Sequence, residues 1–121
     1  MPMQANLNAA IHVLSRSVLF SAFAPEEIRE LAGYFNPITL PRGQALFHAG
    51  DRTGGLYILQ EGTLMEPAER PDEEGLRFGS GSLIGEESLY LQPSRQRSIL
   101  AETDAQLLFM PNSLVQRYLL D

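Results

Sequence analysis

The stretch Gly81-Ser82-Leu83-Ile84-Gly85-Glu86-Glu87-Ser88-Leu89, followed by Arg95, decides how this chain of 121 residues is interpreted. It places a glycine and a carboxylate before a short helical segment, and Arg95 lies nine positions after the first glutamate. Each feature has an ordinary explanation by itself, because a Gly-Glu pair often forms a turn before an acidic first helical turn and a loop arginine is usually solvated. Leu83, Ile84 and Leu89 are expected in the core under any interpretation. The meaning of the stretch therefore depends on the pattern around it.

Short β-rich runs lie on both sides of this stretch and alternate with glycine, proline and aspartate. Several short strands at this spacing are typical of a β-sandwich or barrel. The runs are Ile38 to Leu40, Ala45 to His48, Leu56 to Leu59, Gly62 to Met65, Leu76 to Phe78, Ser98 to Ala101 and Gln106 to Met110. Aromatic residues of this region are expected to fill the core of the β-structure rather than to stack on a ligand; they are Phe47, Tyr57, Phe78 and Tyr90. The acidic, proline-bearing segment Glu66 to Gly75 predicts a solvated hairpin loop.

Helical segments flank the β-rich region. Apolar residues at helical spacing predict a first helix over residues 5–15. Proline with two glutamates predicts the start of a second helix at Pro25, and Asn36-Pro37 is expected to stop it. Residues 112–120 predict a short C-terminal helix with Asn112 or Ser113 as its N-cap. We therefore expect one domain over residues 1–121, with a helical N-terminal segment at 5–36, a β-roll at 37–111 and a C-terminal helix at 112–121.

Composition excludes several classes of function. The formal net charge of −6 argues against a nucleic-acid-binding surface, which usually carries a basic patch. Cysteine is absent, so disulfides, thiolate metal sites and cysteine nucleophiles are excluded. No apolar run approaches the roughly 18 residues that a membrane helix needs, and residues 1–8 lack the pattern of a secretory signal. We therefore expect a cytoplasmic protein that makes no membrane contact and binds no nucleic acid through this chain.

Four segments of the chain, taken in order, resemble cyclic-nucleotide-binding domains, the family of catabolite activator proteins, kinase regulatory subunits and cyclic-nucleotide-gated channels. Gly81–Leu89 with Arg95 resembles the phosphate-binding cassette of that family. The other matching segments are Leu19-Phe20 through Ile28, the hairpin from Gly43 to Asp51, and the strand and turn from Leu56 to Gly62. The resemblance covers roughly residues 17–120. It implies a mainly β fold, a double-stranded β-helix or jelly-roll-like β-roll with flanking N- and C-terminal helices.

The resemblance also implies a ligand, cAMP or cGMP, and a set of contacts. Backbone N–H groups at the start of the short helix would favour the phosphate, and a glycine there would let the backbone approach it closely. Glu86 would accept a hydrogen bond from the ribose 2′-hydroxyl, and Arg95 would form a charge-assisted fork to the phosphate oxygens. The binding residues expected on this basis are Gly85, Glu86, Glu87, Ser88, Leu89, Arg95 and Gln96. Neither a metal nor another cofactor is expected.

Three positions depart from the family pattern. Glu87 stands where an aliphatic residue is usual and would bring a second carboxylate to the phosphate site unless it points outward. Arg97 stands where a small residue is usual, and strand alternation would place it on the same side as Arg95, where it would crowd the pocket or act as a second phosphate donor. Gln96 replaces a small residue and leaves the choice between adenine and guanine open.

We expect a regulatory sensor domain that is part of a larger protein such as a transporter, channel or regulator, because the usual C-terminal capping helix does not follow Asp121. A homodimer is compatible with this interpretation. The alternative is a degenerate domain that binds no nucleotide and acts as a protein-interaction or assembly module, which Glu87 and Arg97 favour. An enzyme of the metal-dependent jelly-roll kind needs clustered histidines, whereas His12 and His48 lie in separate segments. No enzymatic activity is therefore expected.

Overall fold

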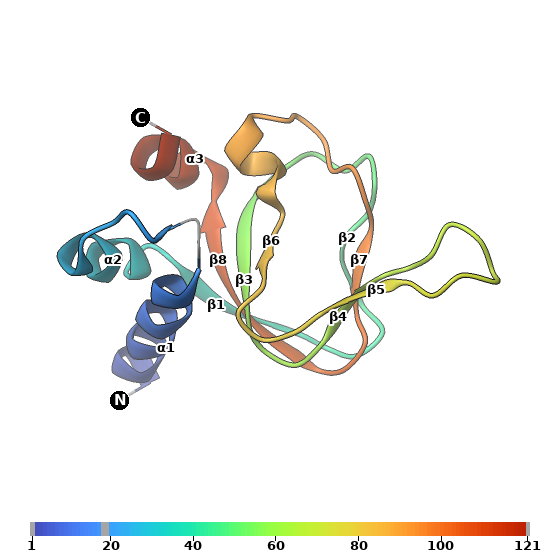
Figure 1. Cartoon of the computed structure of the whole chain (residues 1–121), viewed down its shortest axis with the longest axis horizontal. Helices are drawn as coiled ribbons and strands as arrows, with labels where there is room; N and C mark the ends of the chain where they lie inside the picture. The colour runs from blue at the N-terminus through green and yellow to red at the C-terminus, as the bar shows by residue number, and fades with distance from the viewer. Residues whose placement is uncertain (1, 18–19, 121) are drawn as a thin grey trace.

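The computed structural model describes residues 2–17 and 20–120, without the side chains of residues 2–6 and 9. In this part of the chain, eight short strands form two antiparallel sheets, with helices before and after them (Figure 1). The first sheet has the order β1 (Asn36–Leu40), β8 (Ala105–Pro111), β3 (Gly55–Glu61) and β6 (Leu83–Ile84). The second has the order β2 (Ala45–Phe47), β7 (Ile99–Ala101), β4 (Leu64–Glu66) and β5 (Leu76–Phe78). This confirms the mainly β, jelly-roll-like β-roll with flanking helices.

Two hydrophobic cores meet along the first sheet. Successive side chains of a strand point to opposite faces, so Leu56 and Ile58 of β3 pack against the helices, whereas Leu59 packs between the two sheets. The same alternation in β8 places Leu108 in the helical core and Leu107 between the sheets. Central strands that are buried on both faces read as continuous apolar runs, and β3 and β8 have this pattern.

The helices cover the outer face of the first sheet, at the left of Figure 1. α1 spans Pro2–Arg16 and α2 spans Pro25–Ala32, and the C-terminal segment consists of α3 (Asn112–Val115) and one π-helical stretch (Gln116–Leu120). The ring of Tyr34, which follows α2, stacks on Tyr118 of the C-terminal segment with the ring centroids 4.2 Å apart. This stack links the N-terminal helices to the C-terminal one.

Two local predictions at the helix ends are wrong. The N-cap of α3 is Pro111, and neither Asn112 nor Ser113 caps it, because both residues already lie inside the helix. The second helix ends at Ala32, and the Asn36-Pro37 pair that was expected to stop it begins β1 instead.

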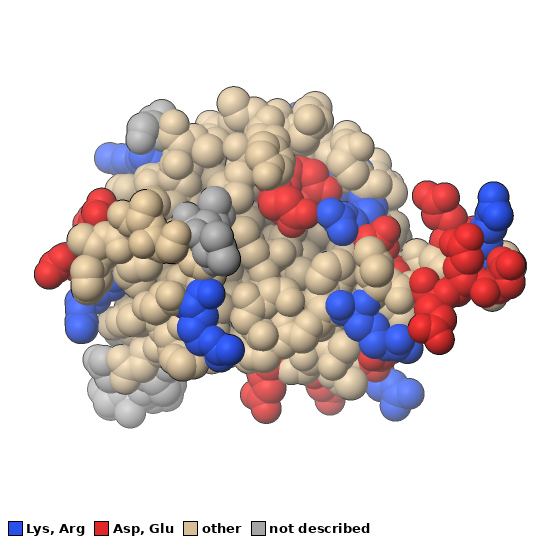
Figure 2. Space-filling view, viewed as in Figure 1, with Lys and Arg blue, Asp and Glu red and all other residues tan. Residues whose placement is uncertain are grey.

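The loop between β4 and β5 projects from the end of the roll opposite the helices (Figure 1). It spans residues 67–75 and contains Glu69, Asp72, Glu73 and Glu74. Figure 2 shows these acidic side chains gathered at the right edge of the molecule. The predicted solvated hairpin loop is thereby confirmed, and it lies away from the helical face.

Candidate functional site

The backbone turns sharply between β6 and the short 3-10 helix η2 (Glu86–Tyr90). Gly85 makes this turn in the left-handed region, with φ of 83°, where residues with a Cβ are strained. A Cβ at this position would also lie 2.5 Å from Nη1 of Arg95. Glycine is therefore required twice, by the backbone angle and by the guanidinium that packs against it.

The guanidinium of Arg95 lies inside the protein, where it connects three segments. Its side chain is 1% exposed. Nη2 donates to the carbonyl of Gly55 at 2.7 Å, and Nη1 donates to the carbonyl of Gly85 at 3.2 Å and to Oε1 of Glu87 at 3.3 Å. The guanidinium carbon lies 4.2 Å from the centre of the Phe47 ring, which adds a cation–π contact. Arg95 thus ties the turn at Gly85 to β3 and β2.

Glu87 points inward and supplies the counter-charge of Arg95. Its residue exposure is 6%, and its Oε2 accepts the backbone N–H of Gln96 at 3.0 Å. Burial by itself raises the pKa of Glu87, but the hydrogen bond from Gln96 and the charge of Arg95 outweigh it and hold the pKa below its ordinary value. Of the two orientations considered from the sequence, the structure therefore has the one in which the carboxylate reaches the arginine.

Arg97 makes a second link between the turn and the roll. Its Nη2 donates to Oε1 of Glu86 at 2.8 Å and its Nη1 donates to Oε1 of Glu66 at 3.1 Å. Strand alternation does not explain its position, because β7 begins only at Ile99 and residues 95–98 form no strand. Even so, Arg95 and Arg97 each reach one of the two consecutive carboxylates. The Arg97 side chain remains about one-third exposed, at 36%.

The other residues expected at the site have mainly packing roles in this conformation. The backbone N–H of Ser88 donates to the carbonyl of Gly85 at 3.1 Å, and the buried Oγ of Ser88 has no hydrogen-bond partner among the described residues. Leu89 packs against the helical core. The side chain of Gln96 is exposed, and its Nε2 donates to the carbonyl of Ser94 at 3.3 Å. For Gln96 it is the backbone N–H, not the side chain, that contributes to the site.

A small cavity of about 40 Å³ lies between this turn and the second sheet. Its apolar wall includes Phe47, Phe78 and Ile99, and its polar rim consists of Glu86, Glu87 and Arg97. The same three rim residues border an outer cleft of about 270 Å³, which also includes Tyr90 and Gln96. The two cavities therefore share one charged rim, which consists of Glu86, Glu87 and Arg97. Phe47, Tyr57 and Phe78 pack against the core between the sheets as predicted, whereas Tyr90 is 72% exposed and the prediction that it fills the core is wrong.

A family profile described as a cyclic nucleotide-binding domain matches residues 37–121, which include the whole β-roll and the turn at Gly85. The chain belongs to the cyclic-nucleotide-binding domain family. The family that the sequence resembles is thereby confirmed. The stretch from Gly85 to Arg97, which the sequence analysis compared with a phosphate-binding cassette, is called the cassette below.

Individual relatives agree with this assignment. The chain is 35% identical over 95 residues to the Cyclic AMP receptor protein of Thermus thermophilus, covering 76% of this chain and 44% of that protein. The crystal structure of the N-terminal domain of a transcriptional regulator from Streptomyces coelicolor is 34% identical, with a TM-score of 0.75 over 88% of this chain and 79% of that one. The regulatory domain of Toxoplasma gondii PKA with cAMP, only 14% identical, shares the fold with a TM-score of 0.81 over 95% of this chain and 46% of that one. The chain spans about half the length of the curated relatives it matches.

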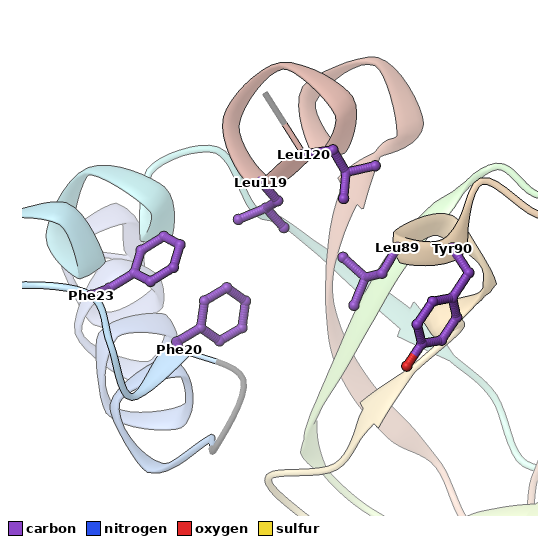
Figure 3. A pocket seen from close by; sticks show the side chains of 6 residues that line it. All are labelled: Phe20, Phe23, Leu89, Tyr90, Leu119 and Leu120. Carbon is purple, nitrogen blue, oxygen red and sulfur yellow. The ribbon is translucent and has the colours of Figure 1, made fainter.

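A third, apolar cavity of about 230 Å³ lies between the cassette helix and the helical side of the cyclic-nucleotide-binding domain. Figure 3 shows side chains from three separate segments around it, with Leu89 pointing across the gap toward Phe20 and the ring of Tyr90 extending downward. They are Phe20 and Phe23 before α2, Leu89 and Tyr90 of the cassette helix, and Leu119 and Leu120 near the C-terminus. The cassette helix therefore lies beside both helical segments.

The described residues contain no group of three or more side chains that could hold a metal ion. His12 lies in α1 and His48 directly after β2, and both are exposed. Within the same described part, no helix is long and apolar enough to cross a membrane.

Sequence reasoning missed three residues that shape the site. The carbonyl of Gly55 accepts from Arg95, Phe47 packs beneath its guanidinium, and Glu66 pairs with Arg97. The Gly54-Gly55 pair had only the signal of a turn. A Cβ on Gly55 would collide with the Met110 carbonyl and the Phe109 ring. The need for glycine here arises from the pairing of β3 with β8, which no local sequence pattern reveals.

Proposed function

We propose that this chain is a regulatory module that binds a cyclic nucleotide, cAMP or cGMP, at the charged rim of the cassette. Binding would then change the activity of the longer protein to which the module belongs. One observation carries this proposal above all: Arg95, the backbone N–H of Gln96 and Arg97 converge on the two carboxylates that border the cavity. Relatives named as a cyclic AMP receptor protein and as a cAMP-activated transcriptional regulator support the same class of ligand.

Each charged residue would have a separate task in binding. Arg97 is the more accessible cation, and its charge-assisted donors can turn toward an incoming phosphate. Glu86, released from Arg97, can accept a hydrogen bond from a ribose hydroxyl. Arg95 contributes positive charge from beneath the turn. The apolar wall at Phe47, Phe78 and Ile99 suits the sugar and base edges rather than the phosphate.

The response would travel through the cassette helix. Leu89 packs against the same hydrophobic core as Phe20, Phe23 and Leu119. A displacement of η2 therefore changes the packing of both the N-terminal and the C-terminal helical segments. An effect on an attached domain would then be a coupling free energy between the nucleotide site and that domain.

A second function is favoured by a specific observation, the internal pairing of both cassette arginines. Arg95 is 1% exposed and pairs with Glu87, and Arg97 pairs with Glu86 and Glu66. In a domain fixed in this way, the fold would serve as a nucleotide-independent interaction or assembly module, in which self-association is one outcome.

Calorimetric titration of the purified chain with cAMP and cGMP at matched salt separates the two functions. A sensor gives a one-site isotherm for at least one nucleotide, and Arg97→Ala weakens the affinity at least tenfold. Arg77→Ala is the matched control, because Arg77 also pairs with a carboxylate, that of Glu102, but lies outside the cassette. Flat isotherms for both nucleotides with folded protein would refute the sensor and leave the interaction module.

A further inference from the structure

The donors of the cassette already hold an anion, which belongs to the chain itself. The two carboxylate oxygens of Glu87 are divided between two donors: Oε1 accepts from the Arg95 guanidinium at 3.3 Å and Oε2 accepts from the Gln96 backbone N–H at 3.0 Å. A phosphate held by the same residues would place one oxygen on a guanidinium and another on a backbone N–H. The side chain of Glu87 is 8% exposed, so solvent does not compete for these bonds.

The remaining hydrogen bonds of Arg95 fix the guanidinium in this orientation. Carbonyls of Gly55 and Gly85 accept from it, and the Phe47 ring lies against its face. Arg95 therefore cannot swing out to meet a ligand without losing all of these partners. An anion that uses Arg95 must come to the place where the Glu87 carboxylate lies.

The balance of charges in and around the cassette leads to the same conclusion. Three carboxylates, on Glu66, Glu86 and Glu87, face two guanidinium groups, on Arg95 and Arg97. A further anion would meet an excess of negative charge, because like charges at such distances repel strongly in a partly buried site. The simplest exchange is the removal of one carboxylate as the ligand anion arrives.

We infer that Glu87 is a resident anion, an internal substitute for phosphate that holds the cassette closed and that an external anion must displace. Glu87 is thus the residue that determines how tightly the cassette binds an external anion. The inference rests on the proposed function only for the identity of the natural ligand, since any small oxyanion can report whether the donors are free.

Inorganic phosphate and the two cyclic nucleotides are the probes. The thermal unfolding midpoint of the whole chain is measured against phosphate at constant ionic strength, because a ligand that binds only the folded state raises it. The variants are Glu87→Gln, which keeps an oxygen that can accept from Gln96, and Glu87→Ala, which vacates the position. Glu102→Gln is the control, since it removes the same charge from an ion pair outside the cassette.

We expect both Glu87 variants to be stabilised by phosphate in a saturable way, with an apparent affinity at least tenfold tighter than that of the wild type and of Glu102→Gln. The same order is expected for cAMP or cGMP by calorimetry. The inference is overturned if phosphate affects the Glu87 variants no more than the wild type, or if the wild type binds nucleotide as tightly as Glu87→Gln. If phosphate separates the variants but no protein binds either nucleotide, the resident anion stands and the proposed sensor function fails.

Discussion

Replacing Arg95 by alanine is expected to destabilise the fold. A loss of ligand binding in this variant would therefore not by itself assign Arg95 to a contact with the ligand. The substitution removes a buried guanidinium that donates to Gly55, Gly85 and Glu87 and packs on Phe47. It leaves the Glu87 carboxylate buried without its counter-charge and removes one donor from each of two carbonyls. Removal of a single partner from a buried ion pair is among the most costly substitutions known for proteins.

The magnitude follows from these contacts. Breaking a buried pair by deleting one partner costs about 3–5 kcal/mol. Folded domains are stable by only about 5–15 kcal/mol in total, so this loss is a substantial fraction of the stability. With an m-value of about 2 kcal/mol per molar urea, a loss of about 4 kcal/mol lowers the unfolding midpoint by about 2 M.

Urea unfolding monitored by circular dichroism measures this shift, and a double-mutant cycle assigns it. Glu87→Leu introduces the aliphatic residue that the family pattern favours, and Arg95→Ala with Glu87→Leu closes the cycle by replacing both charged groups with apolar ones. Apolar replacement of both partners of a buried pair is often neutral or stabilising. The double variant should therefore be more stable than Arg95→Ala, with an interaction energy of about 1–3 kcal/mol between the two positions.

A midpoint for Arg95→Ala within about 0.5 M of the wild type, equivalent to about 1 kcal/mol, would refute this interpretation of Arg95. Additive effects of the two positions would refute it as well. Either result would mean that Arg95 is not held by the contacts described, and a loss of nucleotide binding in Arg95→Ala could then be assigned directly to ligand contact.

Three further outcomes follow from the cassette geometry. Gly85→Ala should lower the free energy of unfolding by about 1–2 kcal/mol because of its left-handed backbone, and by more because the new Cβ displaces Arg95. Gly43→Ala, with φ of 86° and open space around it, should show only the backbone effect, and urea midpoints compare the two variants. The pKa of Glu87 is lower in the folded state than its ordinary value of 4.5, so its contribution to stability is complete above that pH and is lost as the pH falls through the folded pKa. The unfolding free energies of the wild type and of Glu87→Gln should therefore converge in acid, and a difference that stays constant with pH would contradict this. Ser88→Ala should be neutral or stabilising by up to about 1 kcal/mol, because the hydroxyl is buried without a partner, and a thermal midpoint well below the wild type would contradict it.

Most of the β-roll could be predicted from the sequence, because its strands are separated by strong turn residues. The exception is β6, which has only two residues, Leu83 and Ile84. Two residues are too few for an alternating pattern, and these two were recognised only as core residues. Their role as a strand comes from pairing with Ile58 and Tyr57 of β3, which is long-range information.

The residues of the candidate site could be listed from the sequence, but their partners could not. The pairing of Glu87 with Arg95 and with the N–H of Gln96 requires the chain to reverse between them. That reversal depends on Leu91, whose φ of 57° is in the left-handed region although it is not a glycine. Non-glycine residues rarely adopt this conformation, so no local rule predicts it. Whether the Glu87 carboxylate points inward or outward was therefore undecided until the loop path was known.

The order of the two carboxylates places both ion pairs of the cassette on one short helix. A 3-10 helix has three residues per turn, so the consecutive side chains of Glu86 and Glu87 diverge by about a third of a turn. One therefore faces the outer cleft and pairs with Arg97, whereas the other faces the interior and pairs with Arg95. A rotation of the short helix would move both carboxylates together and would therefore disturb both ion pairs. A ligand that displaces Glu87 by turning this helix would also displace Leu89, which packs against the helical core, in the same movement.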